Sequence, residues 1–127
     1  MFYEGVLCEN WEEMPKDYEK ARNWYLLSAT QRNAAAQNNL GLMHSKGLGT
    51  SQNYKEALRL YRLSAEQGYA QAQFNLGLMY ADGQGVAEDY AEAIKWLKLA
   101  AEQKFEAAQF KLELMHLNKN LGHYLLN

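Results

Sequence analysis

Three histidines and one cysteine are the residues of this chain best suited to bind a metal or act as a nucleophile. His44 and His116 lie two periods apart in an internal repeat of 36 residues. Packed helices are separated by about 8–10 Å, so stacked repeats would place these imidazoles on the order of 20 Å apart, far beyond the ~2 Å bonds of a shared zinc ion. We therefore interpret both as partly buried, hydrogen-bonded histidines and expect no metal site.

Cys8 and His123 lack the sequence neighbours that catalysis or metal binding requires. No histidine recurs at a fixed distance from Cys8, and nothing beside it favours the reactive thiolate. A small apolar filler is therefore a better interpretation of Cys8 than a nucleophile. His123 has no acidic or thiol partner at the spacing of a metal ligand. We expect no cofactor.

Recurring glutamates and glycine loops have simple explanations that do not involve catalysis. Glu56 and Glu92 stand near the start of two predicted helices, and Glu66 and Glu102 stand at the ends of the same helices. The repeat accounts for them, whereas a glycosidase needs two carboxylates facing each other across a cleft. The Gly-Leu-Gly and Gly-Gln-Gly loops follow helices instead of strands and lack the Lys-Ser/Thr ending of a phosphate loop. The sequence therefore predicts that the chain is not an enzyme.

Length and charge narrow the class of protein further. The chain has 127 residues, with 13 Lys and Arg against 15 Asp and Glu, for a formal net charge of -2. Nucleic-acid-binding proteins usually carry a marked basic excess, so we expect no nucleic-acid partner. No apolar run approaches the ~20 residues that span a bilayer, so we expect no membrane insertion. The sequence as given suits a cytoplasmic protein, or a periplasmic or secreted one from which a signal has been removed.

The elements that position these residues are predicted to be helices. Ala and Leu are abundant, whereas the β-branched residues Val, Ile and Thr number only five. Strands favour β-branched residues, while Ala and Leu lose little conformational freedom in a helix. The composition therefore predicts an all-α chain.

The 36-residue repeat organises the whole chain. Between residues 34–69 and 70–105, 17 of 36 positions are identical without a gap, which chance does not produce. Several positions hold the same residue in three copies, among them Tyr18, Tyr54 and Tyr90; Ala21, Ala57 and Ala93; Gln31, Gln67 and Gln103; Gln37, Gln73 and Gln109; Leu40, Leu76 and Leu112; Met43, Met79 and Met115.

Each unit contains two helical patterns separated by a glycine loop. In residues 70–83 the apolar positions recur at helical spacing, and Gly83, like Gly47, stands where a left-handed residue ends a helix. Asn53 and Asp89 then precede a second helical pattern, with a glutamate three residues on, in the arrangement of a capping box. Each second helix has a wide apolar arc, which suits contact with neighbours on two flanks.

Two short helices cannot bury such surfaces alone, so we predict that the units stack as an α-solenoid. We divide the chain into a partial first unit, residues 1–33, two full units, residues 34–69 and 70–105, and a terminal half unit with a C-terminal cap, residues 106–127.

Residue types at two positions of the repeat predict local backbone features. One is a close contact between helices, and the other is the conformation of a turn. Gly41 and Gly77 lie inside the first helices of the full units, where glycine costs ~1 kcal/mol against alanine. We infer that a neighbouring helix comes close there. At the end of the second helices Gly68 is matched by Arg32 and Lys104, so that turn tolerates ordinary residues.

One stretch of the chain has a recognisable pattern. Residues Ala70–Trp96 read A-x-A-Q-x-x-L-G-x-M-Y-x-x-G-x-G-V-x-x-D-Y-x-x-A-x-x-W, and residues Leu97–Gln103 continue as L-x-x-A-A-E-Q. This pattern resembles the Sel-one-like repeat (SLR), a relative of the tetratricopeptide repeat (TPR), and a weaker match extends from about Asp17 to Met115. The resemblance implies a right-handed superhelix of antiparallel helix pairs whose concave face, lined by the first helices, holds a protein partner. Members of the family are adaptors in signalling, in membrane-protein quality control and in bacterial contacts with host cells.

Both ends depart from the repeat. Residues 1–16 do not make a proper first helix, because the stretch that leads to Tyr18 is longer than the loop of the other units. Glu113 and Lys119 replace glycines of the last unit, and we predict that residues 121–127 fold over its open apolar face as a cap. A fragment, or ends that dock against another copy of the chain, is the alternative that the sequence leaves open.

Helical geometry places an apolar stripe on the first helices, opposite their core side. At 100° per residue the core positions centre near Leu40, and the opposite side carries apolar residues at matching places in each unit. A partner segment could lie on this stripe, or the stripe could pack between adjacent first helices as core. The predicted partner-binding residues are Asn38, Asn39, Leu42, Phe74, Asn75, Leu78, Phe110, Lys111 and Leu114, and Ser45, Ala81 and Leu117 share the stripe.

The second helices carry a basic stripe. We interpret it as a solvated convex face, in preference to a site for an anionic partner, because glutamates interrupt it. Its members are Lys55, Arg59, Arg62, Lys95 and Lys98.

The sequence thus predicts an all-α solenoid that binds another protein or a peptide segment on its concave face and performs no reaction. The alternative is a structural or regulatory subunit that self-associates through its incomplete terminal repeats. An enzymatic function ranks third, because some cysteine-rich relatives of the SLR family are linked with β-lactam binding and this chain lacks their cysteine pairs.

Overall fold

The computed structural model describes the backbone of residues 15–126 and the side chains of residues 18–117. Within this part every regular element is an α-helix, as the composition predicts. The first helices of the units, called A helices, alternate with the second helices, called B helices. The B helices are α2 (Pro15–Thr30), α4 (Tyr54–Glu66) and α6 (Tyr90–Glu102), and the A helices are α3 (Ala34–Lys46), α5 (Ala70–Asp82) and α7 (Glu106–Leu126).

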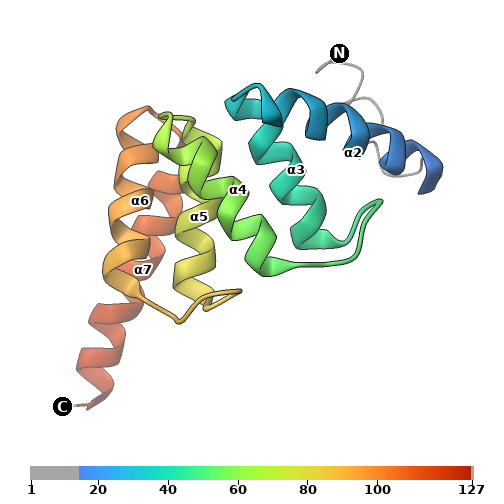
Figure 1. The fold of residues 1–127 in the computed structure, drawn as a ribbon. Helices are drawn as coiled ribbons and strands as arrows, with labels where there is room; N and C mark the ends of the chain where they lie inside the picture. The colour runs from blue at the N-terminus through green and yellow to red at the C-terminus, as the bar shows by residue number, and fades with distance from the viewer. Residues whose placement is uncertain (1–14, 127) are drawn as a thin grey trace.

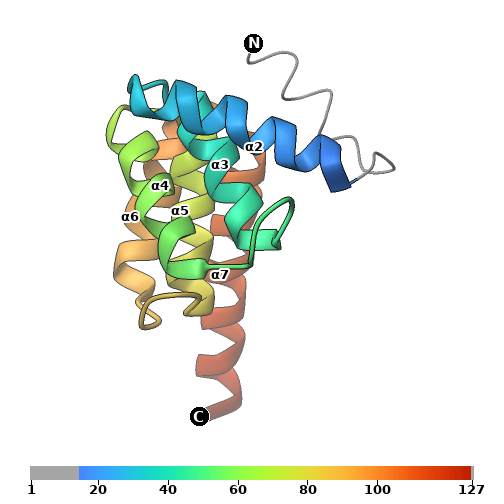
Figure 2. The same cartoon turned by 45° about the vertical axis from the view of Figure 1, so that its right-hand side comes forward.

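The helices form a right-handed superhelical solenoid of antiparallel pairs, which confirms the predicted fold class. Helices α3 and α4 make one hairpin and α5 and α6 make the next, and Figure 1 shows the hairpins side by side, with α2 at one end of the stack and α7 at the other. Figure 2 shows the same order of layers from a second direction. Neighbouring units bury each other's apolar faces, as a repeat architecture requires.

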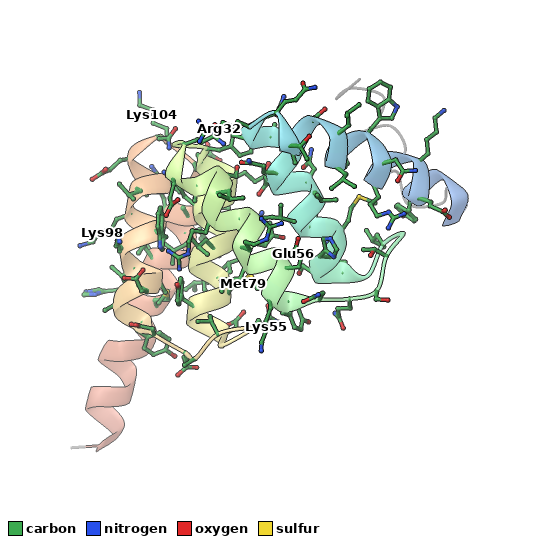
Figure 3. The ribbon with its side chains drawn as sticks, in the orientation of Figure 1. Arg32, Lys55, Glu56, Met79, Lys98 and Lys104 are labelled. Atoms are coloured by element: carbon green, nitrogen blue, oxygen red, sulfur yellow. The ribbon has the colours of Figure 1, made fainter. Side chains whose placement is uncertain are left out.

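The helix ends follow the residues that the repeat singled out. Gly47 and Gly83 end α3 and α5 with φ angles of 70° and 69°. Arg32 and Lys104 adopt the left-handed conformation as well, each with φ of 65°, in the turns where Gly68 has φ of 90°. These two side chains lie along the same upper edge of the stack in Figure 3, Arg32 near α2 and Lys104 near α7. The turn therefore keeps its shape without glycine, as predicted.

The predicted capping boxes form only in part. The side chains of Asn53 and Asp89 accept hydrogen bonds from the backbone N–H groups of Glu56 and Glu92, as N-cap residues do. The reciprocal bond was predicted wrongly, because the N–H groups of the two cap residues donate to the backbone carbonyls of His44 and Tyr80 at the ends of the preceding A helices. The glutamate side chains are left to bind within their own helices, Glu56 to Arg59 and Glu92 to the Trp96 indole.

Helix-to-helix contact is closest at the two glycines inside the A helices. A Cβ atom on Gly41 would lie 2.9 Å from the Tyr61 ring, and one on Gly77 would lie 2.8 Å from Leu97 Cγ and 3.2 Å from the Ala93 carbonyl oxygen. Any side chain at these positions would push the B helix of the same unit away. The inference from sequence that a neighbouring helix comes close is therefore confirmed.

Three clusters of buried side chains lie along the stack, and repeat-fixed residues make up most of them. Small alanines sit at the crossings, and larger apolar side chains fill the space between units. The side chains with less than 2% exposure include Tyr25, Met43, Leu76 and Leu97.

The structure describes the C-terminal end of the chain as a helix, whereas the N-terminal end is not described. Residues 1–14, with Cys8 among them, lie outside the described residues. At the other end, the tail does not fold back. Helix α7 continues to Leu126 and projects away from the stack (Figures 1 and 2). Lys119 stands where Gly83 ends α5, so no glycine is present there to leave the helix, and the chain continues as a helix.

Candidate functional site

The first part of the predicted stripe lies between two A helices. Asn38 has no exposed surface and Asn39 is 9% exposed. The amide of Asn75 on α5 donates a hydrogen bond of 3.0 Å to Asn38 Oδ1 on α3. This pair therefore joins neighbouring units, and Asn38 has no surface with which to contact a partner.

Phe74 has a similar place one unit further on. Its half-buried ring lies 5.3 Å, centroid to centroid, from the ring of Phe105. Both rings pack against a cluster around Leu97, Ala100 and Ala108. Phe74 therefore contributes to packing between the second full unit and α7, which agrees with the core interpretation of this part of the stripe.

Apart from the buried Ala81, the rest of the stripe is partly accessible, and most exposed on α7. Leu42 and Leu78 are half-buried, and Leu114, the third member of the same repeat position, is 39% exposed. On α7 the ring of Phe110 is 62% exposed and Leu117 is 55% exposed. Asn75 and Lys111 are half-buried beside this row. We call Leu42, Leu78 and Leu114 the leucine row.

A ladder of glutamines, whose role the sequence analysis did not assign, joins the units near their B-helix ends. Gln37, Gln73 and Gln109 each donate a hydrogen bond to the carbonyl of the alanine eight residues earlier, at 3.2–3.4 Å. Gln67 donates to Gln37 and Gln103 donates to Gln73, at 2.8 and 2.9 Å. The signal was present in the sequence, because both glutamine positions recur in three copies.

The two histidines in the described part differ from their prediction in hydrogen bonding and exposure. His44 is half-buried, but its Nδ1 atom is buried without a hydrogen-bond partner in the described part of the chain. His116 is exposed, not partly buried, because no B helix follows α7 to cover it within the described residues. The side chain of His123 lies outside the described residues.

The described residues hold no cluster of three or more His, Cys, Asp or Glu side chains that could bind a metal ion. Among the described helices, none combines the length and apolar character of a membrane span.

The basic stripe on the B helices is partly engaged within the protein. Arg59 forms a two-pronged hydrogen bond with Glu56, at 2.9 and 2.6 Å. Lys95 lies 5.0 Å from the centre of the Trp96 ring system, and Arg62 hydrogen-bonds the hydroxyl of Tyr80. Lys55 and Lys98 are exposed; Figure 3 labels both on the outer helices. An exposed ion pair such as Arg59–Glu56 contributes little to stability.

Stacked helical hairpins with an apolar row on the A helices define an α-solenoid repeat protein. The Sel1 repeat family model matches residues 2–33, 34–69 and 70–105, and the chain belongs to this family. Sel1 repeats form non-catalytic scaffolds of the TPR-like class that generally mediate protein–protein interactions.

Two solved structures resemble the chain over most of its length. A Sel1 repeat protein from Oxalobacter formigenes is 41% identical, with a TM-score of 0.76 over 82% of this chain. A protective antigen present in uropathogenic Escherichia coli strains, which displays an SLR fold, is 35% identical, with a TM-score of 0.84 over 93% of this chain. The matches span only 43% and 25% of those two proteins. Comparison with the curated proteins gave no significant match.

Proposed function

We propose that this chain is a non-catalytic protein-binding module that holds a segment of its partner along the concave face formed by the A helices. The observation that supports the proposal is the leucine row. Leu42, Leu78 and Leu114 occupy one repeat position on three successive A helices, and each retains accessible surface. A row of apolar side chains across stacked helices suits an amphipathic helix or an extended segment.

The polar residues beside the row give the partner its orientation. Asn75 and Lys111 flank the row, and their amide and ammonium groups can donate hydrogen bonds to the carbonyl groups of a bound segment. Asn39 lies at the same position one unit earlier, where it has little exposed surface. Phe110 extends the apolar surface at the α7 end. Asn38 and Phe74 act indirectly, because they fix the spacing of the A helices.

A selection of peptides on the intact chain tests this proposal. Peptides enriched from a phage-displayed random library are synthesised, and their affinity is measured by fluorescence anisotropy. The test variant is Leu78→Asn combined with Leu114→Asn. The matched control replaces Leu63 and Leu99 by asparagine, since these two leucines are 39% and 37% exposed on the B helices.

We expect at least tenfold weaker binding for the leucine-row variant and unchanged binding for the control, with both variants retaining the helical circular dichroism of the parent. Equal loss of affinity in both variants, or in neither, would contradict the proposal. A variant that loses its helical signal is replaced by Leu114→Asn alone, at the more exposed position.

Self-association through the end of the stack is a second candidate function. The observation that favours it is the exposure of Phe110 and Leu117 on α7, the outermost A helix of the described part. Light scattering on the purified chain tests it directly. A dimer that Phe110→Ser dissociates supports self-association, and a monomer at millimolar concentration removes it.

A further inference from the structure

An open pocket of about 800 Å³ lies at the α7 end of the stack, on a different side of α7 from the leucine row. Its apolar floor contains Ile94 of α6 and Leu112 and Met115 of α7, with Tyr90 at its edge. The rest of the lining is mostly polar or charged, with one alanine: Ala81, Asp82, Lys98, Lys111, Glu113 and His116. None of these residues takes part in the proposed contact with a partner on the leucine row, except that Lys111 borders both surfaces.

The matching positions of the preceding unit indicate what the pocket can hold. One unit earlier, the residues at the matching positions are Leu58 of α4 and Leu76 and Met79 of α5. They belong to a core cluster that Ala93 and Trp96 of helix α6 complete. The pocket is thus the counterpart of a surface that receives a helix, and it is open because α7 continues straight to Leu126 instead of turning into a further hairpin.

The pocket differs from its internal counterpart at one decisive position. Glu113 stands where the preceding unit has Gly77, which lies against Leu97 of α6. A Cβ atom on Gly77 would already lie 2.8 Å from Leu97 Cγ, so the glutamate side chain excludes a helix that presents leucine there at the same depth. Glu113 is exposed, and an unbranched basic side chain near the position of Leu97 can turn toward solvent beside it and neutralise its charge.

The charges around the pocket also favour one direction for an incoming helix. Asp82 lies at the end of α5, beside the start of α6, whereas Lys98 lies near the other end of α6, on its outer side in Figure 3. A helix that runs in the same direction as α6 places its positive N-terminal end near Asp82 and its negative C-terminal end near Lys98 and Lys111. This is the direction of a B helix in the stack.

From these observations we propose that the pocket between α6 and α7 is a docking site for an amphipathic helix of another protein. The helix runs parallel to α6 and presents an aromatic or leucine side chain to Ile94, Leu112 and Met115. It also carries a small residue at its closest approach to α7. Four residues after that small residue it presents an arginine or lysine, which pairs with Glu113. The site shares only Lys111 with the surface around the leucine row, and neither test changes that residue, so the failure of either proposal leaves the other standing.

Helix α6 itself supplies the probe for a test. Two fluorescein-labelled peptides cover residues 89–103, one with the natural sequence and one with the equivalent of Leu97→Arg. Fluorescence anisotropy measures their affinity for the intact chain. We expect the arginine peptide to bind with 1:1 stoichiometry and about fivefold to tenfold more tightly than the leucine peptide, because only the former pairs with Glu113.

Two variants of the chain make the test specific. Glu113→Gln removes the charge and is expected to abolish the preference for the arginine peptide. Glu66→Gln makes the same chemical change at an exposed position of the middle unit and is expected to preserve the preference. Glu113→Gly restores the internal arrangement and is expected to reverse the preference in favour of the leucine peptide.

Three outcomes would overturn the proposal. One is a failure of both peptides to bind the parent chain at millimolar concentration. Another is an equal response of Glu113→Gln and Glu66→Gln. The third is a dimer of the parent chain that excludes the peptides and that Glu113→Lys dissociates, because the pocket would then belong to a second copy of this chain.

Discussion

Gln103 Nε2 donates a hydrogen bond of 2.9 Å to Gln73 Oε1, and this contact ties the end of α6 to the buried side of α5. Gln73 in turn donates to the carbonyl of Ala65 at the end of α4, at 3.2 Å. One amide side chain thus connects three helices and two repeat units. Because Gln73 is only 5% exposed, water replaces these bonds poorly when they are lost.

Replacing Gln73 by leucine is therefore expected to lower the free energy of unfolding by about 1–3 kcal/mol, since two hydrogen bonds disappear at a buried site. Urea denaturation followed by circular dichroism measures the change. Gln109→Leu is the matched control, because Gln109 is exposed and its side chain makes only the bond to the Ala101 carbonyl in the described structure. Equal losses in the two variants would show that the ladder contributes nothing beyond the single bond.

Gly77→Ala tests the close helix contact inside a unit. Alanine gains about 1 kcal/mol of helix propensity over glycine, but the new methyl group would overlap Leu97 Cγ at 2.8 Å, and such overpacking costs about 1–3 kcal/mol. We expect a net loss of about 1 kcal/mol in the free energy of unfolding, again measured in urea. A more stable variant would mean that α6 can move away at no cost.

Two phenylalanines at one repeat position are expected to respond differently to substitution. Phe74→Ser removes a half-buried ring that packs on Phe105 and is expected to cost about 2 kcal/mol of stability. Phe110→Ser removes a ring that is 62% exposed and is expected to change stability by no more than about 0.5 kcal/mol. Thermal unfolding of the two variants compares them. Similar losses would contradict the assignment of Phe110 to the surface.

The acid stability of the chain should depend in part on Glu56. Two hydrogen bonds from Arg59 hold the pKa of Glu56 below its ordinary value of 4.5, with the charge of Arg59 adding to the effect and partial burial opposing it. Since the pKa is lower in the folded state, the stabilisation is present above pH 4.5 and is lost as the pH falls through the folded-state value.

Comparing Glu56→Gln with the parent chain measures this contribution. We expect a stability difference of about 0.5 kcal/mol at pH 7, the usual size for an exposed pair, that shrinks as the pH falls below 4.5. The same comparison in an Arg59→Gln background should show a smaller pH dependence, because the largest cause of the lowered pKa is then absent. A difference that does not shrink as the pH falls below 4.5 would assign the effect to something other than the carboxylate.

Much of the fold could be predicted from the sequence because the same residue types recur at matching positions of successive units. Gly47 and Gly83 predicted the ends of the A helices, and Gly41 and Gly77 predicted close contact with the B helices. In each case a single physical reason explains the glycine, and its recurrence in the next unit argues against a chance occurrence.

The candidate site could be predicted only in part, for a different physical reason. Helical periodicity identifies the side of an A helix that faces away from the core of its own unit, but not how far the next unit is rotated. Asn38 and Phe74 lie on that side and are covered by the next A helix, whereas Phe110 is not covered within the described residues. Likewise, the backbone carbonyls that take the N–H groups of Asn53 and Asp89 belong to neighbouring helices, which a local capping pattern does not reveal.

The most direct test of the protein-binding role is a map of backbone amide chemical shifts in the isotopically labelled chain during titration with a library-selected peptide. We expect the largest shifts along α3, α5 and α7, at and beside Leu42, Leu78 and Leu114. Shifts confined to the outer faces of α4 and α6, around Leu63 and Leu99, would contradict a binding surface on the A helices.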